Sequence, residues 1–406
     1  MNDRSDDIVL IGGGLAVAHA AETLRDGGYG GRLSVITDEP HRPYERPPLS
    51  KEVLVGSEPP ESVFVHDDAF YTQHDIDVIT DDGVVDVDRG AGTVTTRSGK
   101  SLPFGRLLMA TGARPRRLPI AGGDLDGVVT LRTLDDSRRL NGLLQAAERV
   151  VIVGAGWIGC EVAAAARTLG TAVTLVDPVS HPLERVLGAR IGAYYADLHR
   201  RHGVDLRLGV GVTGLSGNGR VERVEISDGT AVDADLVVVG IGARPSTELA
   251  ERAGLDVDNG IVVDASLVTD DPRIYAAGDV ANAWHPRYGR RLRVEHWDNA
   301  IHQGKTVAAN MLGRGEVYDR VPYFYSDQYD MGMEYVGRAV DVDGVVLRGD
   351  PDSGEFIVFW LSDGRLDAAM NVNIWDVSDD LRGLIGRSVD PARLADTSIP
   401  IPELAG

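Results

Sequence analysis

Two glycine-rich turns carry the clearest chemical signal in the sequence. In "DIVLIGGGLAVAHAAETLRDGG" an apolar segment runs through Gly12 and Gly14 into a helical pattern, and "RVVIVGAGWIGCEVAAAARTLG" repeats this order through Gly154, Gly156 and Gly159. The first glycine of each turn permits a tight connection from strand to helix. The second lets backbone N–H groups approach a pyrophosphate at the positive end of the helix. The sequence therefore predicts two dinucleotide-binding turns.

An acidic residue follows each turn at the end of the next apolar segment. Asp38 ends "RLSVITD" and lies 24 residues after Gly14, and Asp177 ends "AVTLVD" and lies 21 residues after Gly156. We expect both carboxylates to accept hydrogen bonds from ribose hydroxyls. The first turn departs from the pattern in one respect, because Val17 stands where the second turn has its third, close-packing glycine.

The residues beyond the two turns predict different nucleotides. The carboxylate of Asp177 would repel the 2′-phosphate of NADPH, and "PVSH" directly after it supplies no arginine, so we expect NADH there. Arg185 is the nearest cation after that segment. In "IYAAGDVAN" a strand and a small-residue turn place Asp279 where its carboxylate could bind the ribityl chain of FAD. A plain helix cap at Asp279 is the alternative.

The only cysteine of the chain, Cys160, excludes intramolecular disulfides and fits a reducing compartment. It stands in the first turn of the predicted helix after Gly156. A helix N-terminus can lower the pKa of a thiol, which leaves mild reactivity open. The position is nevertheless typical of a small packing residue, and we interpret Cys160 in that way.

The organisation of the chain is predicted to be α/β. "LLMATGARP" (107–115) and "VVVGIGARP" (237–245) echo one another, so the repeat extends beyond the turns. After about residue 320 the pattern changes to antiparallel strands with Asp-Gly turns and a short helical end. A chain of 406 residues is too long for one core. We expect a discontinuous FAD-binding domain (1–112 and 243–320), an NAD-binding domain (113–242) and a C-terminal α+β domain (321–406).

Composition and net charge limit the classes of partner that this protein is expected to bind. The 62 acidic and 41 basic residues give a formal net charge of −21, which repels nucleic acid and anionic membranes. The polar start "MNDRSDD" lacks the pattern of a signal peptide, and no window reaches the ~18 apolar residues of a membrane span. We expect a cytoplasmic protein without a metal site. The basic segment "RYGRRLR" (287–293) is either a solvated loop or a landing site for an acidic partner.

Further motifs extend over nearly the full length. They are "GGGLA", "PYERPPLSK", "ATGARPR", "LRTLDD", "GAGWIGCEVA", "GIGARP", "IYAAGDVA", "VEHWDNAIHQG" and "VPYFYSDQYD". Together they resemble the FAD-dependent ferredoxin reductases of bacterial monooxygenases and ring-hydroxylating dioxygenases. This resemblance implies two Rossmann-like domains in a glutathione-reductase-like architecture. It also implies non-covalent FAD, NADH as reductant, a transient iron–sulfur ferredoxin partner, and a monomer or weak dimer.

The resemblance assigns roles to single residues. Lys51 matches the family lysine near the N5 edge of the flavin, and Glu161 matches the acid that pairs with it, so we expect both to be catalytic. An ammonium there would stabilise the anion of reduced flavin. Trp297 is also a candidate core residue. The other positions that match cofactor-binding residues are Leu15, Ala16, Arg46, Ala110, Thr111, Gly112, Arg114, Arg132, Trp157, Ile158, Gly242, Gly278, Trp297 and Tyr325.

This chain departs from the family in two places and leaves other functions open. Tyr323 and Tyr325 stand where the family commonly has tryptophan, and "NVNIWDVSDD" (371–380) replaces a segment with Asn-Arg-Pro. Disulfide reductases share the layout but need cysteines beside the flavin, where "YERPPLSKEVL" has none, so electrons would pass through flavin alone. The alternatives are a rubredoxin reductase, an NADH oxidase, or a flavin redox sensor resembling apoptosis-inducing factor.

Overall fold

The computed structural model describes residues 7–404, which form two compact units. Unit 1 comprises the chain up to Arg46, Glu61–Arg114 and Arg244–Pro322, and unit 2 comprises Pro47–Pro60, Pro115–Ala243 and the chain from Tyr323 onward. The predicted domain limits after residues 112, 242 and 320 lie within two residues of the unit limits after 114, 243 and 322. The segment 47–60, which the prediction placed in the FAD-binding domain, belongs to unit 2. The three-domain division stays a prediction. The start "MNDRSDD", except Asp7, and the chain end of the predicted third domain lie outside the described residues.

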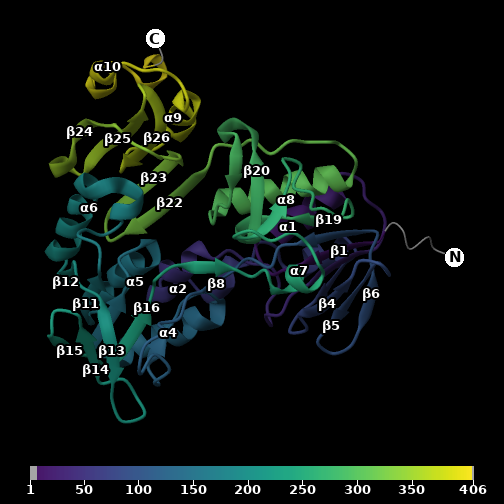
Figure 1. The fold of residues 1–406 in the computed structure, drawn as a ribbon, viewed down its shortest axis with the longest axis horizontal. Helices are drawn as coiled ribbons and strands as arrows, with labels where there is room; N and C mark the ends of the chain where they lie inside the picture. The colour runs from purple at the N-terminus through teal and green to yellow at the C-terminus, as the bar shows by residue number, and fades with distance from the viewer. Residues whose placement is uncertain (1–6, 405–406) are drawn as a thin grey trace. The chain divides into compact units, whose positions relative to one another are not determined.

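Unit 1 is built on a parallel sheet (Figure 1). In sheet order its strands are β19 (Ile274–Ala276), β7 (Arg106–Met109), β1 (Ile8–Ile11), β2 (Leu33–Ile36) and β3 (Ile76–Ile79). Every pair is parallel, and β1 is apolar and buried along its whole length, as expected for a strand covered on both faces. Helix α1 (Leu15–Asp26) follows β1 and packs along α8 (Trp297–Met311).

Smaller elements complete unit 1. The strands β4 (Val84–Asp88), β5 (Thr93–Thr96) and β6 (Ser101–Pro103) form an antiparallel sheet. A further sheet contains β18 (Ile261–Val263), β20 (Ala281–His285) and β21 (Arg290–Leu292). The short helices are α3 (Asp68–Gln73), α7 (Glu248–Arg252), η3 (Pro60–Val63), η4 (Gly278–Val280) and η5 (Pro286–Tyr288). The segments β8 (Ala113–Pro115) and β17 (Ala243–Pro245) lie where the chain passes from one unit to the other.

Unit 2 repeats the order of four of these strands in its own parallel sheet. In sheet order the strands are β12 (Asp205–Leu208), β11 (Ala172–Asp177), β10 (Arg149–Val153), β16 (Leu236–Val239) and β9 (Val128–Val129). The fifth strand, β9, comes first along the chain in this sheet, whereas β19 comes last in the sheet of unit 1. β16 stands beside β10 as β7 stands beside β1, so the echo between 107–115 and 237–245 reflects equivalent sheet positions. The prediction of two Rossmann-like domains is confirmed.

Helices and a small sheet surround the parallel strands of unit 2. The helices are η2 (Pro47–Ser50), α2 (Glu52–Val55), α4 (Leu134–Ala146), α5 (Trp157–Thr168) and α6 (Glu184–Arg201). The small antiparallel sheet contains β13 (Val212–Ser216), β14 (Arg223–Ile226) and β15 (Ala231–Asp233). α4 begins with a capping box, in which Thr133 and Asp136 each accept a hydrogen bond from the other's backbone N–H.

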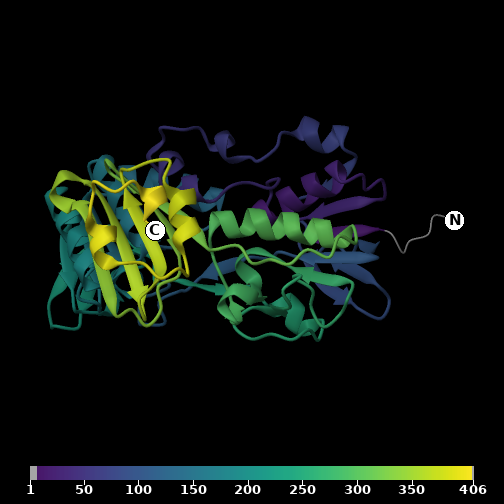
Figure 2. The ribbon, with the colours of Figure 1, turned by 90° about the horizontal axis from the view of Figure 1, so that it is seen from above.

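The chain beyond residue 322 forms the predicted antiparallel sheet with a short helical end. Its strands, in sheet order, are β22 (Tyr323–Gln328), β23 (Met331–Gly337), β26 (Arg365–Val372), β25 (Glu355–Ser362) and β24 (Gly344–Asp350). Figure 2 shows these strands side by side, with α9 (Ser378–Leu384) and α10 (Pro391–Ala395) against the sheet. The hairpin from β25 to β26 turns at Asp363 and Gly364, which both have positive φ, as the Asp-Gly signal predicts.

The C-terminal sheet and the parallel sheet of unit 2 share one hydrophobic core. Phe356 and Trp360 of the C-terminal sheet belong to the same buried cluster as Ile152 of β10 and Leu187 of α6. The indole of Trp360 is almost fully buried and donates a hydrogen bond to the Leu187 carbonyl over 3.3 Å. Unit 1 has its own core around its parallel sheet. Within residues 7–404, no helix combines the length and the apolar character needed to cross a membrane.

Candidate functional site

The turn of unit 1 leaves open space where the pyrophosphate is expected. Gly12 adopts φ of +139°, and a Cβ there would lie 2.3 Å from the Ala110 carbonyl oxygen, so only glycine fits. A Cβ at Gly14, the N-cap of α1, would meet no atom within 4 Å. Among residues 7–404, no side chain caps α1. The first N–H groups of the helix are therefore available to a phosphate, and the cradle fits a dinucleotide.

The turn of unit 2 has the same construction. Gly154 has φ of +109°, and a Cβ on it would lie 2.4 Å from the Gly240 carbonyl oxygen. Gly156 caps α5 with open space beside it, as Gly14 does for α1. A Cβ at Gly159 would lie 1.9 Å from the Gly154 carbonyl oxygen, so the third glycine is required for close packing. This second cradle also fits a dinucleotide.

The two predicted ribose acids differ in their surroundings. In unit 2 the Asp177 carboxylate accepts hydrogen bonds from the backbone N–H groups of Ala155 (2.7 Å) and Val179 (2.9 Å). An ionised carboxylate has about four acceptor positions, so ribose hydroxyls can still bind to it. In unit 1 Asp38 follows β2 and is exposed.

Arg46 of unit 1 is held by an acid that the sequence analysis missed. Its guanidinium donates to Glu39 over 2.8 Å and to the hydroxyl of Tyr44 over 3.0 Å, and Tyr44 in turn donates to Glu39. The three side chains form one polar cluster on the connection that follows β2. The available signal was a second carboxylate directly after Asp38, seven residues before Arg46.

Asp279 lies at the same edge of the unit 1 sheet as the glycine turn. It follows β19, whose carboxyl end points to the edge where β1 ends, because both strands run parallel to β7. The backbone N–H of Gly278 donates to Gln303 over 2.8 Å, which fixes the turn. Ligands of open α/β sheets bind beyond the carboxyl ends of the strands, so Asp279 stands on the expected side.

The remaining predicted residues of unit 1 are anchored in different ways. The hydroxyl of Thr111 donates to the Ser246 carbonyl over 2.7 Å, and the indole of Trp297 donates to Glu45 over 3.1 Å. Leu15 and Ala16 are buried in α1. The carbonyl of Ala110 lies close to Gly12. Gly112 has positive φ. The exposed side chain of Arg114 lies 3.8 Å from the carboxylate of Glu248.

Lys51 and Glu161 form a buried ion pair in unit 2. The ammonium of Lys51 lies 3.0 Å from Oε1 of Glu161, and the two side chains are 8% and 5% exposed. Lys51 also donates to the Pro47 carbonyl over 3.4 Å. The pair joins the residue directly after η2, which is the N-cap of α2, to α5, 110 residues further along the chain. A charge withdrawn from water this far is tolerated only with a partner and further hydrogen bonds.

Two serines that the sequence analysis missed complete this pair. Ser50 donates to Oε2 of Glu161 over 2.5 Å, and Ser326 of β22 donates to Oε1 over 2.6 Å. Glu161 thus receives donors on both oxygens. The only signal was that each serine lies in a motif already noted, "PYERPPLSK" or "VPYFYSDQYD".

The other predicted residues of unit 2 lie around the pair or around the turn. The ring of Tyr325 lies 5.4 Å from the Lys51 ammonium, so tyrosine supplies a cation–π contact where the family commonly has tryptophan. Trp157 packs edge-on against Phe324, and Ile158 is 43% exposed in the first turn of α5. The last two are Arg132, whose backbone N–H donates to Asp136, and Gly242, which has positive φ.

Cys160 is a packing residue, as predicted, and the alternative prediction of a mildly reactive thiol is wrong. Its side chain is completely buried in the core of unit 2, and its thiol faces the Ala155 carbonyl at 3.7 Å. Burial raises the pKa of the Cys160 thiol well above its ordinary value, and Glu161 and Asp177 add to this effect. Loss of solvation therefore outweighs the helix N-terminus.

The basic segment 287–293 is partly used by the fold of unit 1. Arg291 donates to the carbonyls of Val263 and Asn282, and Arg293 donates to the carbonyl of Asp279 and to Glu295. Arg287 donates to the Asp319 carbonyl. These contacts give three of the arginines a structural role, while Arg287, Arg290 and Arg291 remain exposed. The landing site stays a prediction.

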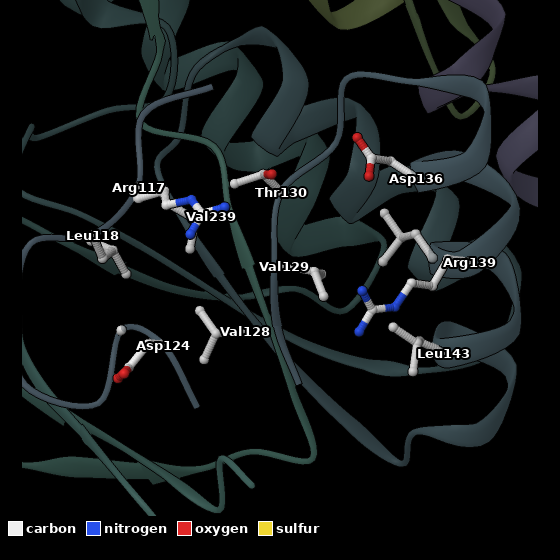
Figure 3. Close-up of a pocket in the computed structure, with 12 residues that line it drawn as sticks. Arg117, Leu118, Asp124, Val128, Val129, Thr130, Asp136, Arg139, Leu143 and Val239 are labelled. Carbon is white, nitrogen blue, oxygen red and sulfur yellow. The ribbon is translucent and has the colours of Figure 1, made fainter. Parts of the chain in front are cut away.

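A separate pocket of about 270 Å³ lies within unit 2. Figure 3 shows the guanidinium groups of Arg117 and Arg139 at this pocket. Arg139 is 65% exposed and lies 3.8 Å from Asp126, and Asp136 belongs to the capping box of α4. None of the residues that line the pocket is among the predicted cofactor residues. We assign it no part in the site.

Comparison with known proteins agrees with this geometry. Residues 6–304 match the model of the pyridine nucleotide-disulphide oxidoreductase family, and residues 323–405 match the reductase C-terminal model. The chain is 40% identical to the ferredoxin–NAD(+) reductase component of the anthranilate 1,2-dioxygenase system of Burkholderia cepacia, covering 97% of this chain and 98% of the relative. It is 37% identical to putidaredoxin reductase of Pseudomonas putida, covering 99% and 97%.

Solved structures extend the similarity to the whole fold. The crystal structure of the covalent putidaredoxin reductase–putidaredoxin complex matches with a TM-score of 0.94 and 36% identity, covering 98% of this chain and 97% of that one. The glycine turns, the duplicated parallel sheets and the C-terminal sheet thus occur together in proteins of one family. This chain belongs to the pyridine nucleotide-disulphide oxidoreductase family and carries its reductase C-terminal domain.

Proposed function

We propose that this chain is an NADH-dependent, FAD-containing ferredoxin reductase that serves a monooxygenase or dioxygenase. The named relatives, a dioxygenase reductase component and putidaredoxin reductase, support this proposal over nearly the full length. The balanced reaction takes NADH and two oxidised ferredoxins to NAD⁺, two reduced ferredoxins and one proton. Each ferredoxin accepts one electron.

The residues of unit 1 fit the binding of FAD. The N-terminus of α1 would bind the pyrophosphate, Asp38 the adenosine ribose and Asp279 the ribityl chain. Arg46, fixed by Glu39, would place a positive charge near these groups. In this proposal FAD is bound non-covalently.

The residues of unit 2 fit the binding of NADH. The N-terminus of α5 would bind the pyrophosphate, and Asp177 would bind the adenosine ribose through the acceptor positions left beside its two backbone donors. The same carboxylate would repel a 2′-phosphate, which supports NADH over NADPH.

The side chains of this protein supply position and charge rather than redox chemistry. When bound, FAD would supply the chemistry, because it accepts two electrons from NADH as a hydride and releases them singly. Lys51 would provide a fixed positive charge where negative charge develops, and Glu161 would hold its ammonium in place. The buried thiol of Cys160 takes no part.

The partner in this proposal is a small iron–sulfur ferredoxin that binds transiently. The solved complex of putidaredoxin reductase with putidaredoxin supports such a partner. We further propose that the protein is a monomer or weak dimer in the cytoplasm, where its single cysteine would remain reduced.

One observation carries the proposal: the buried Lys51–Glu161 pair in unit 2, in a chain whose only thiol is a packing residue. The first test is to purify the protein and to measure stopped-flow reduction by NADH and by NADPH. Two-iron and three-iron ferredoxins are then compared as acceptors. Colourless protein that does not bind added FAD would contradict the proposal, and steady turnover with oxygen alone would favour an NADH oxidase.

Substitution of Lys51 tests its assigned role. Lys51→Met removes the charge at similar length and should slow reduction by NADH by about tenfold or shift the flavin potential. Lys100→Met, at an exposed lysine, is the matched control. If Lys51→Met changed neither quantity, Lys51 would be removed from the mechanism.

A further inference from the structure

A row of buried polar side chains leads from Glu161 into the interior of unit 2. Ser326 and Gln328 lie two residues apart on β22 and therefore on the same face of the strand. His199 of α6 contacts Gln328, and the hydroxyl of Tyr329 contacts His199. Ser326, Gln328 and His199 are at most 1% exposed. We call this row the donor chain, and its members are Tyr329, His199, Gln328 and Ser326.

The hydrogen bonds of the donor chain all point in one direction. Oε1 of Gln328 lies 3.0 Å from Nε2 of His199, and because a carbonyl oxygen only accepts, Nε2 must carry the proton. Nδ1 of His199 is then the acceptor for the Tyr329 hydroxyl at 3.1 Å. At the other end, the Gln328 amide donates to Ser326 over 3.3 Å.

Ser326 connects the donor chain to the ion pair of Lys51 and Glu161. Its oxygen receives the Gln328 amide, so its single proton is directed to Oε1 of Glu161, at 2.6 Å. Lys51 donates to the same oxygen, at 3.0 Å. Every donor from Tyr329 to Lys51 is therefore oriented toward one carboxylate.

The hydrogen bonds of the donor chain require a neutral His199 imidazole with its proton on Nε2, and the surroundings of His199 favour this state. Burial lowers the pKa of His199 to about 4, with a smaller contribution from His202, although the hydrogen bond to Gln328 opposes it. At neutral pH the ring is neutral and carries one N–H, on Nε2.

We propose that the donor chain fixes the orientation of the Glu161 carboxylate and thereby holds the ammonium of Lys51 in one position. His199 and Gln328 are then positioning residues, which act on Lys51 through Ser326 and Glu161. The inference rests on the function proposed above, in which Lys51 is the fixed charge of the redox site. Burying a row of polar side chains is unfavourable unless each of them makes its hydrogen bonds. Here those hydrogen bonds also fix the orientation of the Glu161 carboxylate.

The lysine content of the chain makes a direct test feasible. Lys51, Lys100 and Lys305 are the only lysines in the sequence, and the latter two are exposed. In full-length protein labelled with ¹⁵N at the lysine side chains, NMR should give three ammonium signals. The measured quantity is the rate at which the Lys51 ammonium exchanges hydrogen with water, which rises when the pair with Glu161 loosens.

The key variant is His199→Phe, which keeps a ring and removes both nitrogen atoms. We expect exchange at Lys51 to become about fivefold to tenfold faster, because Gln328 loses the donor that fixes its amide. His199→Gln places an amide N–H near the position of Nε2 and should restore most of the wild-type rate. His202→Phe is the matched control, because His202 stacks on Tyr329 and its Nδ1 lies 2.9 Å from the carbonyl oxygen of Leu198, which is outside the donor chain.

A double-mutant cycle shows whether the effect passes through Glu161. In a Glu161→Gln background, His199→Phe should leave exchange at Lys51 unchanged. If His199→Phe does not fold, Gln328→Met and Ser326→Ala give the same test. The proposal is overturned if the folded variants of the donor chain leave exchange at Lys51 within about twofold of wild type. Failure of ferredoxin reduction would sink the proposed function and leave this exchange result standing.

Discussion

At the scale of single residues, the buried carboxylates of this protein are paired and hydrogen-bonded at the same time. Glu161 receives Lys51 and two serine hydroxyls. Asp298 of unit 1 is 4% exposed and receives two hydrogen bonds from Arg320, at 2.6 and 2.7 Å. Removing one partner leaves an uncompensated buried charge, which costs about 3–5 kcal/mol. Each pair is therefore a place where one substitution has a large effect.

The first prediction concerns Asp298 and acid stability. Burial alone would raise its pKa, but His302 and Arg320 outweigh burial and lower the pKa to about 2. Because the pKa is lower in the folded state, the pair contributes about 2 kcal/mol above pH 4, and this is lost as the pH falls from about 4 to 2. Asp298→Asn should reduce the free energy of unfolding at neutral pH and flatten its dependence on pH over this interval, as measured by urea denaturation. The exposed Asp379→Asn should change neither.

The second prediction concerns Cys160. Cys160→Ser should leave electron flow from NADH to an artificial dye within about twofold of wild type, since the thiol is buried away from solvent. A thiol reagent should react with the native protein only as fast as it unfolds. Rapid labelling of native protein, or a large loss of activity in the variant, would mean that sulfur chemistry contributes after all.

At the scale of elements, glycine has two different tasks in the helices of unit 2. Gly159 of α5 lies against the Gly154 carbonyl, where a Cβ would approach to 1.9 Å. Gly142 of α4 has no atom within 4 Å of the position of a Cβ. The first glycine is required by packing, whereas the second only adds freedom to the unfolded chain.

The third prediction compares these two glycines. Gly142→Ala should stabilise the protein by about 0.5–1 kcal/mol, because alanine favours the helix. Gly159→Ala should destabilise it and weaken NADH binding at least tenfold, because the helix must move away from the turn. Thermal unfolding measures the change in stability of both variants, and titration with NADH measures the change in affinity. Equal effects of the two substitutions would show that the turn is not tightly packed.

At the scale of the whole molecule, the C-terminal sheet is part of the architecture of unit 2. Trp360 lies in the cluster that includes α6 and the parallel strands, and it is 2% exposed. The same region contains the Glu161–Ser326 hydrogen bond, which joins residues 165 positions apart. The reductase C-terminal segment thus supports the nucleotide-binding part of its own unit.

The fourth prediction follows from this shared core. Trp360→Ala should lower the free energy of unfolding by about 3–5 kcal/mol. Hydrogen exchange should become faster in α6 as well as in the C-terminal strands, because one core holds both. Trp375→Ala, at a tryptophan that is 54% exposed, should cost less than about 1 kcal/mol. Faster exchange confined to the C-terminal strands would contradict a shared core.

The sequence by itself determined the two parallel units, their glycine turns and the C-terminal antiparallel sheet. These features depend on local spacing: a glycine at a tight turn, apolar runs of strand length, and Asp-Gly at a hairpin. The pairing of Lys51 with Glu161 came from resemblance, and the structure brings the two side chains together.

Only the tertiary structure decided which distant polar residues meet. His199 carries no local pattern that sets it apart, and its contact with Gln328 joins two elements that are 129 residues apart. The hydrogen bond from Ser326 to Glu161 spans 165 residues in the same way. The same holds for the shared core of unit 2 and for the raised thiol pKa, since burial is a property of packing. Local sequence fixes turns and periodicity, whereas desolvation and long-range hydrogen bonds arise only when the chain has folded.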